Sequence, residues 1–105
     1  MSGIGRGTTA TNTFKTSCDL REATVLYITY SQDDHVVFEK TINDVVEITE
    51  DHVVVQLTQK DTLMLDSDTK VEIQIRAGFG GENGARVVSN ILKTSVGRIL
   101  KEGAI

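Results

Sequence analysis

The stretch Thr69–Ala77, with the sequence TKVEIQIRA, carries the clearest pattern in the chain. Every second residue from Val71 to Ala77 is apolar, and the residues between them are polar or charged. Strict alternation places the apolar side chains on one face of a β-strand and the polar side chains on the other. The segment therefore predicts a strand with one buried and one solvated face, as in an antiparallel sheet.

Similar segments lie on both sides of this strand. In Ala23–Ser31 both alternating sets are apolar, which indicates a central strand. The turn sequence SQDD at Ser31–Asp34 joins it to His35–Thr41, and together they predict a hairpin. The other expected strands are Thr11–Thr16, Val45–Thr49, His52–Thr58 and Arg86–Val96, followed by a tail strand or turn at Gly97–Ile105 in which Ile99 and Leu100 dock.

Non-strand signals separate these segments. Thr58 and Asp61 resemble a capping box, so we expect one helical turn near residues 59–65. Gly78–Ala85 holds four glycines and is typical of a mobile hairpin loop. Six to eight short strands at a spacing of roughly 8–12 residues predict an all-β fold, an antiparallel β-sandwich or small barrel. We expect one domain over residues 10–105, preceded by a flexible arm at residues 1–9.

Length and composition exclude several classes of protein. A chain of 105 residues with 39% hydrophobic residues fits one small domain with an ordinary core. Cys18 is the only cysteine, so an intramolecular disulfide and a thiolate-rich zinc site are both excluded. No apolar run approaches the ~20 residues of a membrane helix, and no hydrophobic stretch follows the first arginine. We therefore expect neither a membrane partner nor a secretory signal.

Acidic residues gather in the middle of the chain. Residues 31–72 contain eleven acidic and three basic residues, a local net charge of −8. Such a region disfavours DNA or RNA as a partner, because phosphate binding needs a basic face. It leaves two interpretations open: contact with a basic protein surface, or ordinary solvated turns. The candidate partner-binding residues are Asp33, Asp34, Glu47, Glu50, Asp51 and Phe79.

Phe79 lies in the glycine-rich sequence GFGGENGA. A single aromatic side chain in such a loop is either an anchor for a protein contact or a lid over one end of the core. The sequence does not decide between these two interpretations.

Catalytic and metal-binding patterns are weak. Cys18 would need His35 or His52 as its base, and no spacing brings either histidine to it. The histidines with nearby aspartates match no metal-ligand spacing. Glu47, Glu50 and Asp51 could supply paired carboxylates, but a short chain of strands can hardly form the deep cleft that glycoside hydrolysis requires. We expect a protein that is not an enzyme and has no cofactor or metal.

Longer stretches of the sequence resemble a known group. The segments ATVLYITYSQDDHVVFEKT and SNILKTSVGRIL, and above all LTQKDTL at Leu57–Leu63 and VEIQIR at Val71–Arg76, resemble small proteins encoded in phages and prophages of Gram-positive gut bacteria. The chain is also distantly similar to the N-terminal β-sandwich of phage baseplate upper proteins. The resemblance covers about residues 6–102. Its motifs are fold signatures, so the resemblance implies architecture and assigns no site residues.

Two functions are consistent with these observations. The first is a virion or tail-associated component that binds a phage structural protein, or a second copy of itself through an edge strand. The second is a phage-encoded inhibitor of host defence of the anti-CRISPR type, whose acidic surface binds a nuclease effector. The corresponding locations are the virion and the host cytoplasm.

Overall fold

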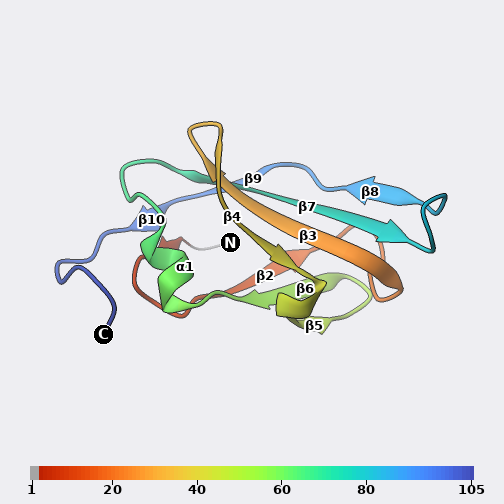
Figure 1. Ribbon diagram of the computed structural model, residues 1–105, viewed down its shortest axis with the longest axis horizontal. Helices are drawn as coiled ribbons and strands as arrows, with labels where there is room; N and C mark the ends of the chain where they lie inside the picture. Colours follow the sequence, from red (N-terminus) through yellow and green to blue (C-terminus); the bar gives the residue numbers. More distant parts are fainter. Residues whose placement is uncertain (1–2) are drawn as a thin grey trace.

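The computed structural model describes residues 3–105 and consists mainly of β-strands (Figure 1). In chain order the elements are β1 (Ile4–Gly5), β2 (Thr11–Lys15), β3 (Ala23–Gln32), β4 (His35–Thr41), the 3-10 turn η1 (Ile42–Asp44), β5 (Val45–Ile48), β6 (His52–Gln56), α1 (Gln59–Leu63), β7 (Val71–Phe79), β8 (Arg86–Val88), β9 (Leu92–Thr94) and β10 (Val96–Gly97). Besides the two-stranded pair of β1 and β10, the larger sheet has the order β4-β3-β7-β8, with β9 also on β7, and the smaller sheet has the order β2-β6-β5. Both sheets are antiparallel, and the expected sandwich-like all-β fold with a short helical turn is confirmed.

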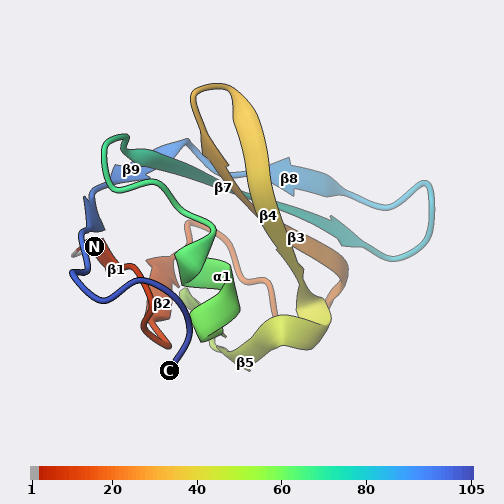
Figure 2. The ribbon, with the colours of Figure 1, turned by 60° about the vertical axis from the view of Figure 1, so that its left-hand side comes forward.

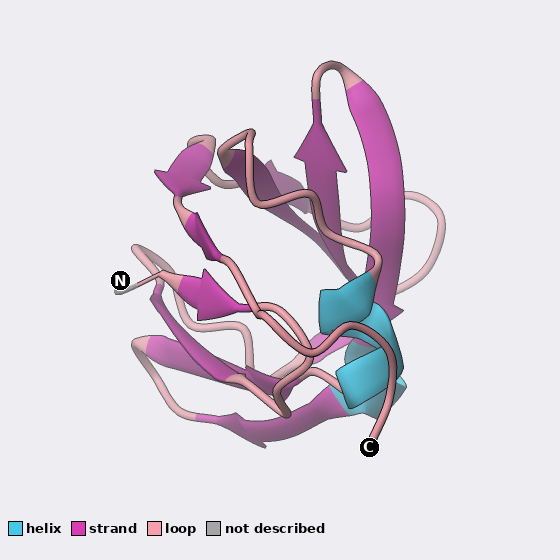
Figure 3. Ribbon diagram, turned by 90° about the vertical axis from the view of Figure 1, so that its left-hand side faces the viewer, coloured by secondary structure: helices cyan, strands magenta, loops and turns pink. Residues whose placement is uncertain are grey.

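The core fills the space between the two sheets, which form separate layers in Figure 3. Every second residue of β7 from Val71 to Ala77 is at most 4% exposed, as the alternation predicts. On the central strand β3 the side chains of Leu26, Ile28 and Tyr30 are buried. The Tyr30 hydroxyl donates a hydrogen bond of 2.7 Å to Oδ1 of buried Asn12 on β2, which links the two sheets.

The hairpin of β3 and β4 is tighter than the sequence indicates. The strands extend to Gln32 and from His35, so only Asp33 and Asp34 form the turn. Both aspartates have positive φ, 50° and 64°. A two-residue turn with both central residues in the left-handed region matches the twist of antiparallel strands, and Asp tolerates this conformation better than most residues do.

Both helical turns begin with a capping box. At α1 the Asp61 carboxylate accepts from the Thr58 amide at 2.8 Å, and the Thr58 hydroxyl accepts from the Asp61 amide at 3.1 Å, which confirms the predicted box. A second box, which was not predicted from the sequence, begins η1, and in it the Asp44 carboxylate accepts from the Thr41 amide at 2.9 Å. Only Asp61 also forms an ion pair, with Lys40 of β4.

The N-terminal segment does not form a free arm. Residues 1–2 lie outside the described residues, but Ile4 is 1% exposed and β1 pairs in parallel with β10. The guanidinium of Arg6 donates to the carbonyl oxygens of Leu65 at 2.6 Å and Leu63 at 3.1 Å, at the C-terminal end of α1. The expected flexible arm is therefore wrong for residues 3–9, because one buried aliphatic side chain and one arginine attach it to the domain.

The glycine-rich loop is also shorter than expected. Gly78 and Phe79 belong to β7, so the loop spans residues 80–85. The guanidinium of Arg86 donates to the carbonyl oxygens of Gly81 and Gly84, each at 3.0 Å. The loop is thus held by a cation at its base.

The structure of the C-terminal tail matches the prediction from the sequence only in part. Ile99 is half-buried and its side chain lies close to Gly7. Leu100, by contrast, is 92% exposed, so its expected docking is wrong. Within residues 97–105 only Gly97 belongs to a strand, because β1 pairs with no more than two residues of the chain.

Candidate protein-binding surfaces

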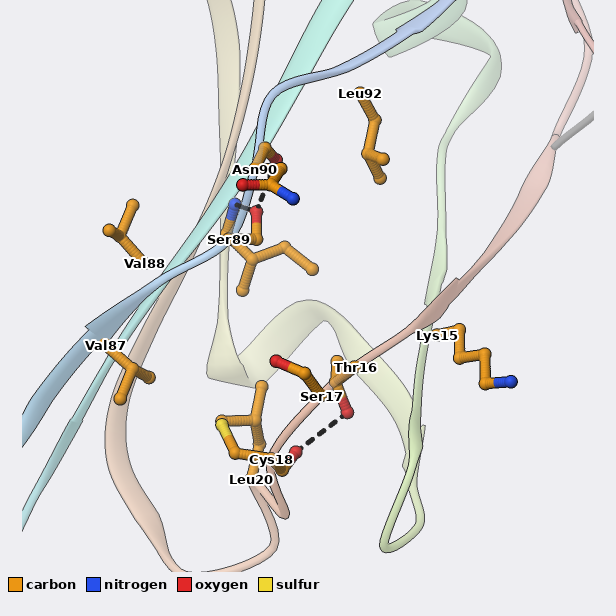
Figure 4. A pocket seen from close by; sticks show the side chains of 11 residues that line it. Lys15, Thr16, Ser17, Cys18, Leu20, Val87, Val88, Ser89, Asn90 and Leu92 are labelled. Carbon is orange, nitrogen blue, oxygen red and sulfur yellow. Dashed lines mark hydrogen bonds between the residues drawn. The ribbon is translucent and has the colours of Figure 1, made fainter.

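A groove of about 550 Å³ opens between the two layers beside β8 and β9 (Figure 4). The end of β2 and the loop that follows it form one wall, and β7, β8 and β9 form the other. Leu20 and Ile75 are buried at its apolar surface. The lining residues are Lys15, Thr16, Ser17, Cys18, Leu20, Ile75, Val87, Val88, Ser89, Asn90 and Leu92.

A β-bulge between β8 and β9 shapes this groove. The Ser89 amide donates to the Ile75 carbonyl at 2.8 Å, and Leu92 is the register partner of Ile73. Two residues, Asn90 and Ile91, therefore lie opposite one residue of β7. Asn90 lines the groove, whereas Ile91 lines a smaller hollow of about 310 Å³ beside residues of β3 and β4.

The edge formed by β8 and β9 carries the exposed apolar side chains that the sequence analysis missed. Val88 is 59% exposed, Ile91 55% and Leu92 38%. β8 and β9 pair with β7 on one side, and no strand of residues 3–105 pairs with them on the other. The signal that could have revealed this surface is the polar pair Ser89 and Asn90, which interrupts the apolar run of the expected strand.

The structure divides the acidic candidates between two places. Asp33 and Asp34 form the tip of the β3–β4 hairpin on the larger sheet. Glu47 lies on β5, and Glu50 and Asp51 lie in the turn between β5 and β6 of the smaller sheet. Figures 1 and 2 show the hairpin tip far from β5. The five residues therefore do not form one acidic face.

Phe79 is half-buried and packs against the core cluster. It ends β7, and its register partner is Ala23 on β3. This position matches the interpretation of Phe79 as a lid over the core. Its remaining exposure leaves only part of the ring for a partner.

The histidines and the cysteine lie on separate elements. His35 begins β4 on the larger sheet, whereas His52 begins β6 on the smaller sheet. Nδ1 of His52 lies 2.6 Å from a carboxylate oxygen of Asp51, and this hydrogen bond is the main cause that holds the pKa of Asp51 below its ordinary value. Cys18 is exposed at the groove. Over residues 3–105 no three His, Cys, Asp or Glu side chains are close enough to hold a metal ion.

In the same part of the chain, no helix has both the length and the apolar character needed to cross a bilayer.

Comparisons with known proteins give a likeness of architecture only. No protein-family model matches the chain, and no curated protein matches it. Among solved structures it is similar to the Ig-like domain of mouse leukocyte-associated immunoglobulin-like receptor 1, solved as a strand-swapped dimer. That likeness has a TM-score of 0.45 and 16% identity over 90% of this chain and 85% of that one. It is also similar to the V domain of amphioxus IgVJ-C2, with a TM-score of 0.37 and 11% identity over 91% and 99% of the two chains.

Proposed function

We propose that the chain is a phage-encoded protein-binding module, and that it serves as a virion or tail-associated component. The observation that supports this proposal best is the outer side of β8 and β9, with which no strand of residues 3–105 pairs and which lies beside an apolar groove. An extended partner segment can pair its backbone with such an edge, while alternate side chains enter the groove. The proposed role is binding, without a catalytic step.

Exposed aliphatic side chains support the choice of this edge over the smaller sheet. Exposed Val88 and Ile91 lie on either side of Ser89 and Asn90, and Leu92 adds to the groove wall. Clustered apolar surface of this kind marks interaction sites more often than single exposed residues do. On the smaller sheet Val46 is comparably exposed, at 62%, but lies on neither of the two hollows.

Mass spectrometry of purified particles from an induced prophage tests the proposal. We expect the wild-type chain in the particles and a strong reduction for V88D, because a carboxylate at this edge would have to lose water on binding. V46D is the matched control and should remain in the particles. Absence of the wild-type chain from particles, or equal retention of V88D and V46D, would contradict the proposal.

The second candidate is an inhibitor of a host nuclease effector in the cytoplasm. The excess of acidic residues in positions 31–72 supports it, although these acids are spread over both sheets, the two helical turns and the loops between them. This candidate predicts that the chain co-elutes with the effector and that reversal of Asp33, Asp34, Glu50 and Asp51 to lysine abolishes binding. Binding that survives the reversal would exclude an electrostatic inhibitor.

A further inference from the structure

We infer that the partner of the β8–β9 edge is a second copy of this chain, whose β4 edge pairs with it in a head-to-tail arrangement. The inference rests on the proposed function only in taking a sheet edge as the binding surface. β4 is the opposite edge of the same sheet, and no strand of residues 3–105 pairs with its outer side.

Strand direction permits this pairing. Each neighbouring pair in the order β4-β3-β7-β8 is antiparallel, so β8 runs opposite to β4. When a second copy is placed beside the first in the same orientation, its β8 and β9 lie antiparallel to β4. The two larger sheets then continue as one, with their buried faces on the same side. At ~3.3 Å a residue, the seven residues of β4 offer an edge of roughly 23 Å.

Charge distinguishes this arrangement from a symmetric dimer. The β4 edge and its flanking turns carry Asp33, Asp34, Glu39 and Asp44, and its one lysine, Lys40, points inward to an ion pair with Asp61. The β8–β9 edge carries Arg86 and Lys93 with no acidic residue between positions 83 and 101, and the nearest acid in the sheet is Glu72 of β7, the register partner of Lys93 on the side away from the edge. Two β4 edges related by a twofold axis would place acid beside acid, and two β8–β9 edges would place base beside base. Only the head-to-tail arrangement joins opposite charges.

Both edges also carry exposed aliphatic side chains. Val36 on β4 is 64% exposed, and Val88 and Ile91 on the other edge are more than half exposed. Glu39 and Lys93 share the outer face of the sheet, since their register partners Thr29 and Glu72 both belong to its outward set. In the antiparallel register that places Glu39 opposite Lys93, Ile91 lies opposite Thr41, and Val36 and Val88 stay outside this contact. Pairing in this register would remove the apolar surface of Ile91 from water while an acidic and a basic side chain approach on the same face.

A head-to-tail contact does not close on two copies. Each protomer contacts one neighbour through its β4 edge and another neighbour through its β8–β9 edge. The contact therefore generates a ring or a filament. Such a product is larger than a dimer, and its formation depends on concentration and on salt.

Charge-swap variants test the inference by sedimentation velocity on the purified chain over a range of concentrations. The wild type should form species larger than a dimer, and these should weaken as salt rises from about 0.05 to about 0.5 M. E39K and K93E should each weaken self-association by roughly five- to tenfold, because each places like charges across the contact. E47K, on the smaller sheet, is the control and should behave as the wild type.

Mixing the two variants provides the decisive result. In a one-to-one mixture, Lys at position 39 of one chain meets Glu at position 93 of the other, and the remaining contact keeps its original pair. Self-association should therefore return in the mixture, and also in the double variant E39K/K93E, which shows in addition that both changes are tolerated by the fold. A wild type that stays monomeric or stops at a dimer, or a mixture that shows no recovery, overturns the inference. Neither result bears on the presence of the chain in particles, which tests the proposed function separately.

Discussion

Replacement of Asp61 by asparagine should cost about 2 kcal/mol of the free energy of unfolding. The Lys40 and Asp61 side chains are 12% and 15% exposed, so the charged amine that remains would be held largely away from water without its partner. Asparagine keeps an oxygen for the Thr58 amide, so most of the cost arises from the lost charge. For a domain of this size the loss lowers the melting temperature by roughly 10 °C.

D44N is the matched control for this change. Asp44 occupies the same place in the capping box of η1, but it has no lysine partner and is exposed. We expect D44N to lose only about 0.5 kcal/mol. Urea unfolding of both variants at neutral pH measures the difference. Equal losses for D61N and D44N would refute the conclusion that the ion pair stabilises the fold.

The pH dependence gives a second measurement of the same contact. Burial alone would raise the pKa of the Asp61 carboxyl, but hydrogen bonds from Lys40 and Thr58 outweigh it and hold the pKa below its ordinary value. A lowered pKa stabilises the folded state above the unfolded value of about 4, and this contribution is lost as pH falls through the folded value. The stability gap between wild type and D61N should therefore shrink in acid. A stability difference between wild type and D61N that does not change with pH would contradict the lowered pKa of Asp61 in the folded state.

Four further substitutions test individual contacts by the same unfolding assay. Y30F should cost about 1–3 kcal/mol, because it leaves the buried Asn12 oxygen without its donor. I4A should cost about 2–4 kcal/mol, whereas a free N-terminal arm would lose nothing. G84A should be more destabilising than G81A, because an added Cβ at Gly84 collides with a backbone carbonyl whereas Gly81 faces open space; equal effects would show that the turn can rearrange.

The alternating segments could be predicted because a period of two ties register directly to burial. The side chains that the alternation predicts to face the core are buried in β7. The same holds for the expected strand His52–Thr58, in which Val53, Val55 and Leu57 are fully buried. The α1 cap could be predicted for a similar reason, since its signal lies within four residues. In each case the physical cause is local in the sequence.

Contacts between distant residues left no such signal. Ile4 and Val96 pair through strands of two residues each, which are too short for any periodicity. The acidic candidates were grouped because they are close in sequence. The chain crosses from the larger sheet to the smaller one at η1, so Asp34 and Glu47 belong to different layers. The bulge at Asn90 reverses the alternation after it, which is why the apolar edge was not expected.

Because the phenol of Tyr30 is buried, the near-ultraviolet absorbance of this ring reports the unfolding of the protein in alkali. The chain has no tryptophan, so tyrosine dominates its near-ultraviolet absorbance. Burial raises the pKa of the Tyr30 phenol. The folded chain therefore keeps the phenol proton at pH values above about 10, at which an unfolded tyrosine releases it. Stability consequently declines as alkali is added, and phenolate absorbance from this ring should rise together with the loss of the native circular dichroism.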